Sequence, residues 1–190
     1  MNSLTTTDRL KELLPQLFSQ QQRQGNYYLR FQLTDDINLL LDLGHVQESL
    51  TIDASQITAV PNLPQYAVGL MTARNQVFLA LDLAHLAGFA PETLNQRQYQ
   101  TIVACVGSSQ NTLQSEEPDL YGLTVKRIQG VSRIQPEQFE SSVASAPEPL
   151  QPFITGSIQE DSAVQDEDSG EQQSWFLLDL ARLIMTQVYS

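Results

Sequence analysis

The sequence predicts a mainly β protein with about ten short strands and a helix at each end. Apolar and polar residues alternate through most of the chain, and the strand-like runs follow one another without helical segments between them. Strands connected in this way pair mostly antiparallel. Because an open sheet edge exposes unpaired backbone groups, small sheets of this kind are expected to close into barrels.

The size and charge of the chain restrict its function. At 190 residues it has room for one domain, or for two small subdomains that share a core. Its formal net charge of −12 and its pI of about 4.3 argue against binding to nucleic acid or to anionic membrane surfaces, since both depend on Lys and Arg.

The single cysteine excludes an intramolecular disulfide and a multi-cysteine metal site. Cys105 lies in an apolar run and is predicted to be a small core residue rather than a nucleophile. Charged residues begin at Asp8, where a signal peptide would need an apolar core, and no apolar run approaches the roughly 20 residues of a membrane span. These features predict a cytoplasmic protein.

Residues 7–23 have the apolar spacing of a helix, with Leu10, Leu13 and Leu17 on one face. Pro15 predicts a kink or a division into two short helices. This helix either packs on the surface of its own domain or docks in a groove of a partner.

From residue 26 the apolar period changes to two. A turn is expected at 35–36, a short connection at 44–48, and one helical turn at 83–88 that Gly88 ends. The expected extended segments of this first half are residues 28–33, 37–43, 50–52, 57–60, 67–73 and 77–82.

A polar connector at 90–100 divides the strands about five and five, which predicts one subdomain at about 26–89 and another at about 101–188. Asp179 is a good N-cap for a final helix. The expected strands of the second half are residues 101–106, 120–125, 128–134, 153–158 and 175–178, with a loop at 141–152.

Residues 157–173 contain six carboxylates and no base, which is half of the net charge of −12. The segment has no periodic apolar pattern, so a disordered acidic insertion is expected. The acidic run 166–168 lacks the glycine and the flanking helices of an EF-hand, and the sequence predicts neither a metal nor a cofactor.

Arg74 and Asn75 separate the apolar runs 67–73 and 77–83, as the two central residues of a β-hairpin turn would. An apolar hairpin of this kind is expected to lie largely inside the domain and to display Arg74 at its tip. Glu48 carries the opposite charge. The two residues form either an ordinary surface ion pair, contributing about 0–1 kcal/mol, or a guanidinium that the glutamate orients towards a partner.

The sequence contains few candidates for catalytic groups. His45 and His85 lie in polar turns, and the sequence contains no G-x-S-x-G elbow, glycine-rich phosphate loop or metal-ligand cluster. The protein is therefore predicted not to be an enzyme. The remaining enzymatic hypothesis combines Asp42 and His45 with a nearby hydroxyl group.

Several short motifs follow one another in a fixed order: residues 28–33 (YLRFQL), 46–48 (VQE), 57–64 (ITAVPNLP), 69–82, 121–125 (YGLTV), 153–156 (FITG) and 175–180 (WFLLDL). This series resembles the CheW-like coupling proteins of bacterial chemotaxis over about residues 26–186. The resemblance implies two five-stranded SH3-like β-barrels around a common core, in a domain at 26–188 that follows an N-terminal helical extension at 1–25.

The resemblance also implies a non-catalytic adaptor that couples methyl-accepting chemoreceptors to a CheA-type histidine kinase. Such an adaptor is cytoplasmic and is recruited to receptor arrays at the membrane. Carried over by position, the implied partner-facing ion pair is Arg74 and Glu48, and the residues that shape the groove are Val60, Pro61, Leu63 and Gly69.

Two further features bear on the partner. The segment around 13–18 looks like cyanobacterial members tied to type IV pilus motility and phototaxis. The family's R-G turn is Arg74-Asn75 here. This departure motivates an alternative, in which a domain of the same fold serves another partner, such as a pilus-associated response regulator.

Overall fold

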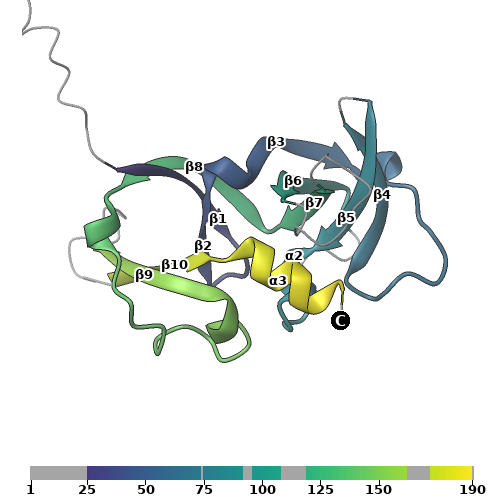
Figure 1. Ribbon diagram of the computed structural model, residues 1–190. Helices are drawn as coiled ribbons and strands as arrows, with labels where there is room; N and C mark the ends of the chain where they lie inside the picture. The colour runs from purple at the N-terminus through teal and green to yellow at the C-terminus, as the bar shows by residue number, and fades with distance from the viewer. Residues whose placement is uncertain (1–24, 74, 92–95, 108–118, 162–171, 190) are drawn as a thin grey trace, which may run out of the picture.

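The chain forms two five-stranded β-sheets and two helices in a computed structural model that describes residues 25–73, 75–91, 96–107, 119–161 and 172–189 (Figure 1). This mainly β architecture confirms the predicted fold class. In chain order the elements are β1 (Asn26–Gln32), β2 (Asn38–Asp42), β3 (Val46–Asp53), β4 (Ala67–Ala73), β5 (Gln76–Asp82), α2 (Leu83–Leu86), β6 (Gln98–Val106), β7 (Asp119–Val125), β8 (Arg127–Ile134), β9 (Ile154–Asp161), β10 (Gln172–Leu178) and α3 (Leu180–Gln187).

Each sheet is assembled from separate parts of the chain. The first sheet has the order β8-β1-β2-β10-β9, and the second has the order β3-β6-β7-β5-β4. Among the described strands, six neighbouring pairs are antiparallel, as expected, and two are parallel, β2 with β10 and β5 with β7.

The expected division of the chain at residues 90–100 is therefore not the division between the sheets. The chain leaves the first sheet after β2, builds the whole second sheet, and returns with β8, whose Ser132 lies opposite Tyr28 of β1. Strand order depends on which distant backbones form hydrogen bonds, and a local apolar pattern carries no information about that choice.

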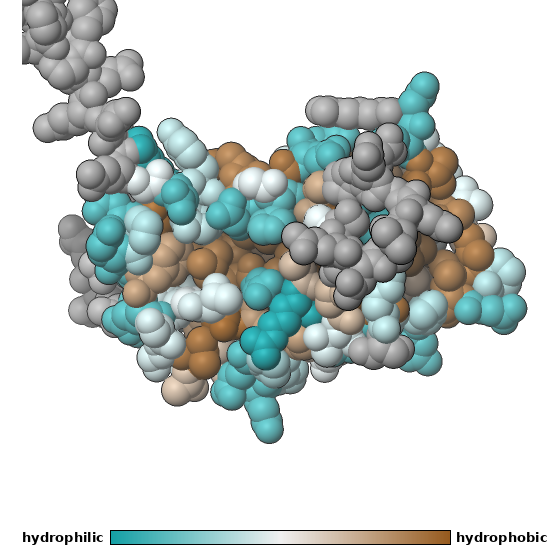
Figure 2. All heavy atoms as spheres, viewed as in Figure 1, coloured by the Kyte–Doolittle hydropathy of each residue, from teal (hydrophilic) through white to brown (hydrophobic). Residues whose placement is uncertain are grey.

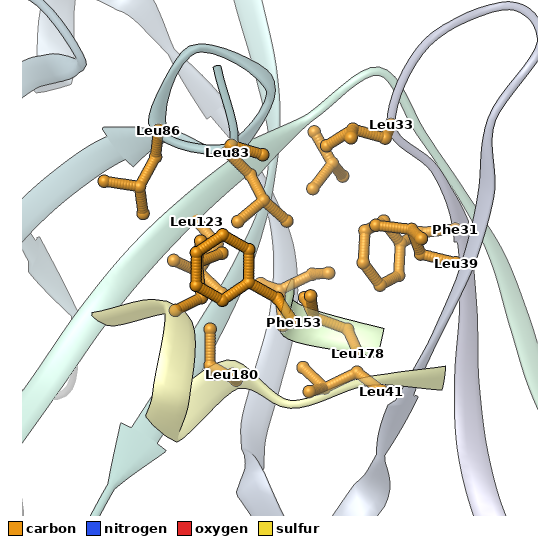
Figure 3. Close-up of a cluster of buried hydrophobic side chains, with 14 of the residues drawn as sticks. Phe31, Leu33, Leu39, Leu41, Leu83, Leu86, Leu123, Phe153, Leu178 and Leu180 are labelled. Carbon is orange, nitrogen blue, oxygen red and sulfur yellow. The ribbon is translucent and has the colours of Figure 1, made fainter. Parts of the chain in front are cut away.

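Alternate residues of each strand enter different cores, because successive side chains point to opposite faces of a sheet. In β2, Leu39 and Leu41 face the space between the two sheets, whereas Leu40 faces the other side of its sheet. Figure 3 shows the shared core, where Phe31 and Leu39 of the first sheet lie across from Leu83 and Leu123.

Each sheet also curls around a small core of its own. Tyr28, Leu40 and Trp175 belong to the core of the first sheet. Met71 and Phe78 belong to the core of the second sheet. The sharing of one large core between two curled sheets agrees with the expectation of two small subdomains that pack together.

The C-terminal helix α3 is present as predicted. The Asp179 carboxylate accepts a hydrogen bond from the Arg182 backbone N–H at 3.0 Å, which caps the first turn. Leu180, Leu183 and Ile184 are buried in the shared core. Figure 1 shows α3, in yellow, lying between the two halves of the molecule.

The expected acidic insertion at 157–173 is shorter than the sequence predicted. Residues 157–161 complete β9, and residues 172–173 begin β10, which pairs antiparallel with β9. Glu160 is held in this position because Arg30 of β1 donates from Nη1 to its Oε2 at 2.7 Å. Residues 162–171 lie outside the described residues.

Three other boundaries differ from the sequence-based expectation. Glu48, expected in a connection, lies in β3, and the expected connector at 90–100 ends in the first residues of β6. The expected strand at 57–60 is reduced to a single bridge between Thr58 and Leu70.

The predicted N-terminal helix at 7–23 lies outside the described residues. Among the residues that the structure describes, no helix combines the length and the apolar character that a membrane span requires.

Candidate functional site

The β4–β5 hairpin has the two-residue connection that the sequence predicted. Ala73 pairs with Gln76, so that only residues 74 and 75 form the turn. Asn75 has a φ of 64°, which is the left-handed conformation that such turns require. Asparagine therefore supplies the left-handed backbone geometry that glycine also provides in such turns. Arg74 itself lies outside the described residues.

Most of this hairpin is buried or half-buried, as expected, and its outer end is exposed. Met71 and Phe78 are buried in the core of the second sheet, whereas Thr72 and Gln76 are exposed. Val77 lies opposite Thr72 and is 67% exposed. The hairpin thus presents an apolar side chain next to its turn.

Residues 59–65 form a loop beside β4, and hydrogen bonds fix both of its ends. At one end the backbones of Thr58 and Leu70 exchange two hydrogen bonds of 2.8 Å. At the other end, Ala67 N–H donates to the Pro64 carbonyl at 2.9 Å. Two anchored ends restrict the loop to a narrow range of positions.

The loop carries three of the residues that were predicted to shape a groove. Pro61 is exposed, and Val60 and Leu63 are half-buried. The loop thus presents partly exposed apolar side chains on a backbone that is hydrogen-bonded at both ends.

Gly69 holds this loop close to β4 and is not itself part of the exposed surface. It is buried, its φ is 151°, and a Cβ atom at this residue would lie 2.5 Å from the Thr58 carbonyl oxygen. Only glycine lets β4 approach the Thr58 backbone so closely.

Glu48 lies on β3, away from the loop in the order of the sheet. Strands β6, β7 and β5 separate β3 from β4 in the hydrogen-bonding order, and Glu48 is half-buried. The structure therefore places Val60, Pro61 and Leu63 in one loop and Gly69 on β4 against the start of that loop. It places Glu48 on β3, whose Ile52 shares the core of this curled sheet with Met71 of β4. The ion pair between Glu48 and Arg74 stays a prediction.

Figure 2 shows apolar residues, in brown, at the surface on the side where β4 and this loop lie. Val77 is the apolar residue here that sequence reasoning missed. The period of two contains the signal, because Phe78 enters the core and its neighbour must then point outward.

Asp42, one of the residues of the enzymatic hypothesis, has a structural role. The Asp42 carboxylate accepts a hydrogen bond from the Gly44 backbone N–H at 2.7 Å and caps a short 3-10 turn at residues 43–45. Its oxygen thus serves the backbone and does not orient His45. Within the described part of the chain, no cluster of three His, Cys, Asp or Glu side chains is arranged to hold a metal ion.

Cys105 is half-buried rather than fully buried, and it lies opposite Leu120 of β7. Burial, followed by the nearby Asp119 carboxylate, raises the pKa of its thiol. A raised thiol pKa disfavours the reactive thiolate, which agrees with the prediction that Cys105 is not a nucleophile.

Comparison with known proteins identifies the family. Residues 27–187 match the family described as CheW-like domain. The chain belongs to the CheW-like family. CheW-like scaffolding domains are non-catalytic, and this chain is therefore not an enzyme.

The fold agrees with a solved CheW structure. A crystal structure of the scaffolding protein TtCheW from Thermoanaerobacter tengcongensis superposes with a TM-score of 0.60 at 18% sequence identity. The similarity covers 87% of this chain and 91% of TtCheW. No curated protein matches the sequence. At this level of identity, the structural comparison supports the CheW fold alone.

Proposed function

We propose that this protein is a signalling adaptor that couples methyl-accepting chemoreceptors to a CheA-type histidine kinase. The observation that carries the proposal is the CheW-like match over residues 27–187, which includes both sheets and the whole β4–β5 hairpin. The adaptor is cytoplasmic and is recruited to receptor arrays.

The adaptor works by binding alone. The exposed end of the β4–β5 hairpin, to which the sequence assigns Arg74, and the loop at 59–65 beside β4 are the proposed contact surfaces. A receptor and a kinase that dock on separate faces of one rigid domain are held in fixed register. Several weak contacts of this kind become strong together, because each one raises the effective concentration for the next.

Replacement of Arg74 tests this surface. We expect Arg74→Ala to weaken binding of the kinase or the receptor by about tenfold or more, the range of an arginine hot spot, without loss of folding. Isothermal titration calorimetry with each purified partner measures the affinity, and circular dichroism measures the fold. Arg182→Ala, which removes an exposed arginine from α3, is the matched control.

Equal affinities for wild-type protein and Arg74→Ala would remove Arg74 from the binding surface. If the wild-type protein binds neither a CheA-type kinase nor a chemoreceptor, the adaptor proposal itself is wrong.

The alternative is a domain of the same fold that binds another partner, such as a pilus-associated response regulator. The observation that favours it is the replacement of the family's turn glycine by Asn75. Affinity purification from the native cell separates the two, because recovery of a response regulator without a CheA-type kinase supports the alternative.

A role in type IV pilus motility and phototaxis is proposed from the resemblance of residues 13–18 alone. Deletion of the gene should then abolish directed movement towards light while leaving pili assembled. Intact phototaxis in the deletion strain contradicts this role.

A further inference from the structure

Tyr189, which follows α3 by two residues, is connected to β7 by a chain of hydroxyl groups. The hydroxyls of Tyr121 and Tyr189 lie 2.7 Å apart, and the Tyr189 hydroxyl lies 3.0 Å from the Asp119 carboxylate. An ionised carboxylate only accepts hydrogen bonds, so Tyr189 donates to Asp119 and Tyr121 donates to Tyr189. The direction of the whole chain is thereby fixed.

Tyr121 is the buried member of this chain. It is 7% exposed, whereas Tyr189 is 56% exposed. Burial, the hydrogen bond to Tyr189 and the charge of Asp119 raise the pKa of the Tyr121 hydroxyl well above its ordinary value. The group therefore keeps its proton, and its function as a donor, throughout the physiological pH range.

A second contact connects the same end of α3 to the partner-facing loop. The Tyr66 hydroxyl donates to the Gln187 carbonyl at 3.2 Å. Tyr66 follows the loop at 59–65, and its own carbonyl accepts from the Asp82 N–H at the end of β5 at 2.8 Å.

These contacts form a closed circuit. Tyr121 of β7 is hydrogen-bonded to Tyr189, and Gln187 at the end of α3 is hydrogen-bonded to Tyr66. Tyr66 is hydrogen-bonded to Asp82 of β5, and β5 pairs in parallel with β7, where Leu79 lies opposite Tyr121. In such a circuit each member is held by two contacts, and a member that loses one of them is held by the other alone.

We propose that Tyr189 is a positioning residue for the partner-facing surface: it holds the end of α3 on β7, and α3 in turn holds Tyr66 and the loop at 59–65. The proposal rests on the proposed function of that loop as a contact surface. It assigns to the C-terminal end of the domain a part in binding that lies outside the surface itself.

Three tyrosine-to-phenylalanine variants test the circuit. Tyr189→Phe breaks the hydroxyl chain, and Tyr66→Phe breaks only the contact with Gln187. Tyr27→Phe is the matched control, because Tyr27 is an exposed tyrosine on β1, in the other sheet. The purified full-length protein is used throughout.

The first readout is the pKa of Tyr121, followed by carbon NMR titration of the tyrosine rings. We expect Tyr189→Phe to lower this pKa towards the ordinary tyrosine value, since one of the causes of its elevation is removed. Tyr66→Phe and Tyr27→Phe should leave it unchanged. An unchanged pKa of Tyr121 in Tyr189→Phe overturns the hydroxyl chain.

The second readout is hydrogen exchange of the backbone amides at 59–67. We expect faster exchange by at least several-fold in both Tyr189→Phe and Tyr66→Phe, with no change in Tyr27→Phe. Unchanged exchange in Tyr189→Phe overturns the positioning role, whatever the binding data show.

The third readout is affinity for the cognate CheA-type kinase and chemoreceptor. Both circuit variants should bind the partner of this surface about threefold to tenfold more weakly, as expected for the loss of one hydrogen bond. If the loop exchanges faster but the affinity for every partner is unchanged, the proposed part of Tyr189 in binding is wrong. If the wild-type protein binds neither partner, the proposed function is wrong. The titration and exchange measurements still test whether Tyr189 and Tyr66 hold the loop.

Discussion

At the scale of single residues, two backbone conformations shape the candidate binding surface. Asn75 takes the left-handed conformation at the hairpin turn, and Gly69 takes a positive φ beside Thr58. The first forms the tight turn next to which Val77 is exposed, and the second brings the loop at 59–65 against β4. Neither residue contributes through its chemistry, and both act by permitting a backbone path that other residues resist.

Gly69 gives a prediction at this scale. Gly69→Ala should lower the free energy of unfolding by roughly 1–3 kcal/mol, because the added methyl group meets backbone atoms and the positive φ is strained. Urea denaturation followed by fluorescence of Trp175, the single tryptophan of the chain, measures the change.

The control is Gly107→Ala. A Cβ atom at Gly107 has no atom within 4 Å, and the expected change stays below about 0.5 kcal/mol. Equal stability of Gly69→Ala and the wild-type protein would show that the loop can move away from β4 without cost.

At the scale of elements, the acidic region shows how a contact between strands overrides composition. Glu160 belongs to a segment that composition predicts to be disordered, yet it lies in β9 and pairs with Arg30. Arg30 also donates from Nε to the Ser132 hydroxyl at 2.8 Å and lies over the Trp175 ring, 4.5 Å from its centroid. One arginine thus connects β1 with β8, β9 and β10. Strand β9 extends to Asp161, one residue beyond the glutamate that Arg30 contacts.

The cap of α3 gives a prediction for an element. Asp179→Ala should lower the free energy of unfolding by about 1 kcal/mol, because the first turn loses a carboxylate that satisfies a free N–H. Thermal denaturation followed by circular dichroism measures the effect.

Asp36→Ala, in the exposed turn before β2, is the control and should have little effect. A loss of stability in this control as large as in Asp179→Ala would mean that the change reflects net charge rather than capping.

At the scale of the whole molecule, the shared core makes the two sheets one folding unit. Leu123 is fully buried between the sheets and belongs to the second, while Trp175 reports on the first. The chain also crosses between the sheets and back, so that neither sheet is continuous in sequence. Both facts argue against independent unfolding of the sheets.

We therefore predict that Leu123→Ala lowers the stability of both sheets together, by about 2–5 kcal/mol. Trp175 fluorescence follows the first sheet, and hydrogen exchange of β6 and β7 amides follows the second. The two transitions should coincide and shift equally. If only the second sheet loses stability, the sheets are separate folding units.

The sequence by itself determined most of the strands, the hairpin turn and the helix caps of this protein, because these features depend on the alternation and the turn chemistry of neighbouring residues. The turn at residues 74–75, the end of α2 shortly before Gly88 and the N-cap of α3 at Asp179 were all predictable in this way. The order of short motifs also sufficed to indicate the CheW-like family.

The tertiary structure alone decided how the strands combine and where the candidate site residues lie. Pairing of β8 with β1, and pairing of Glu48 in β3 with Val103 in β6, depend on contacts between residues far apart in the chain. The same holds for the contact between Tyr121 and Tyr189. Local patterns fix which face of a strand is apolar, whereas burial and backbone hydrogen bonding across the whole molecule choose its neighbours.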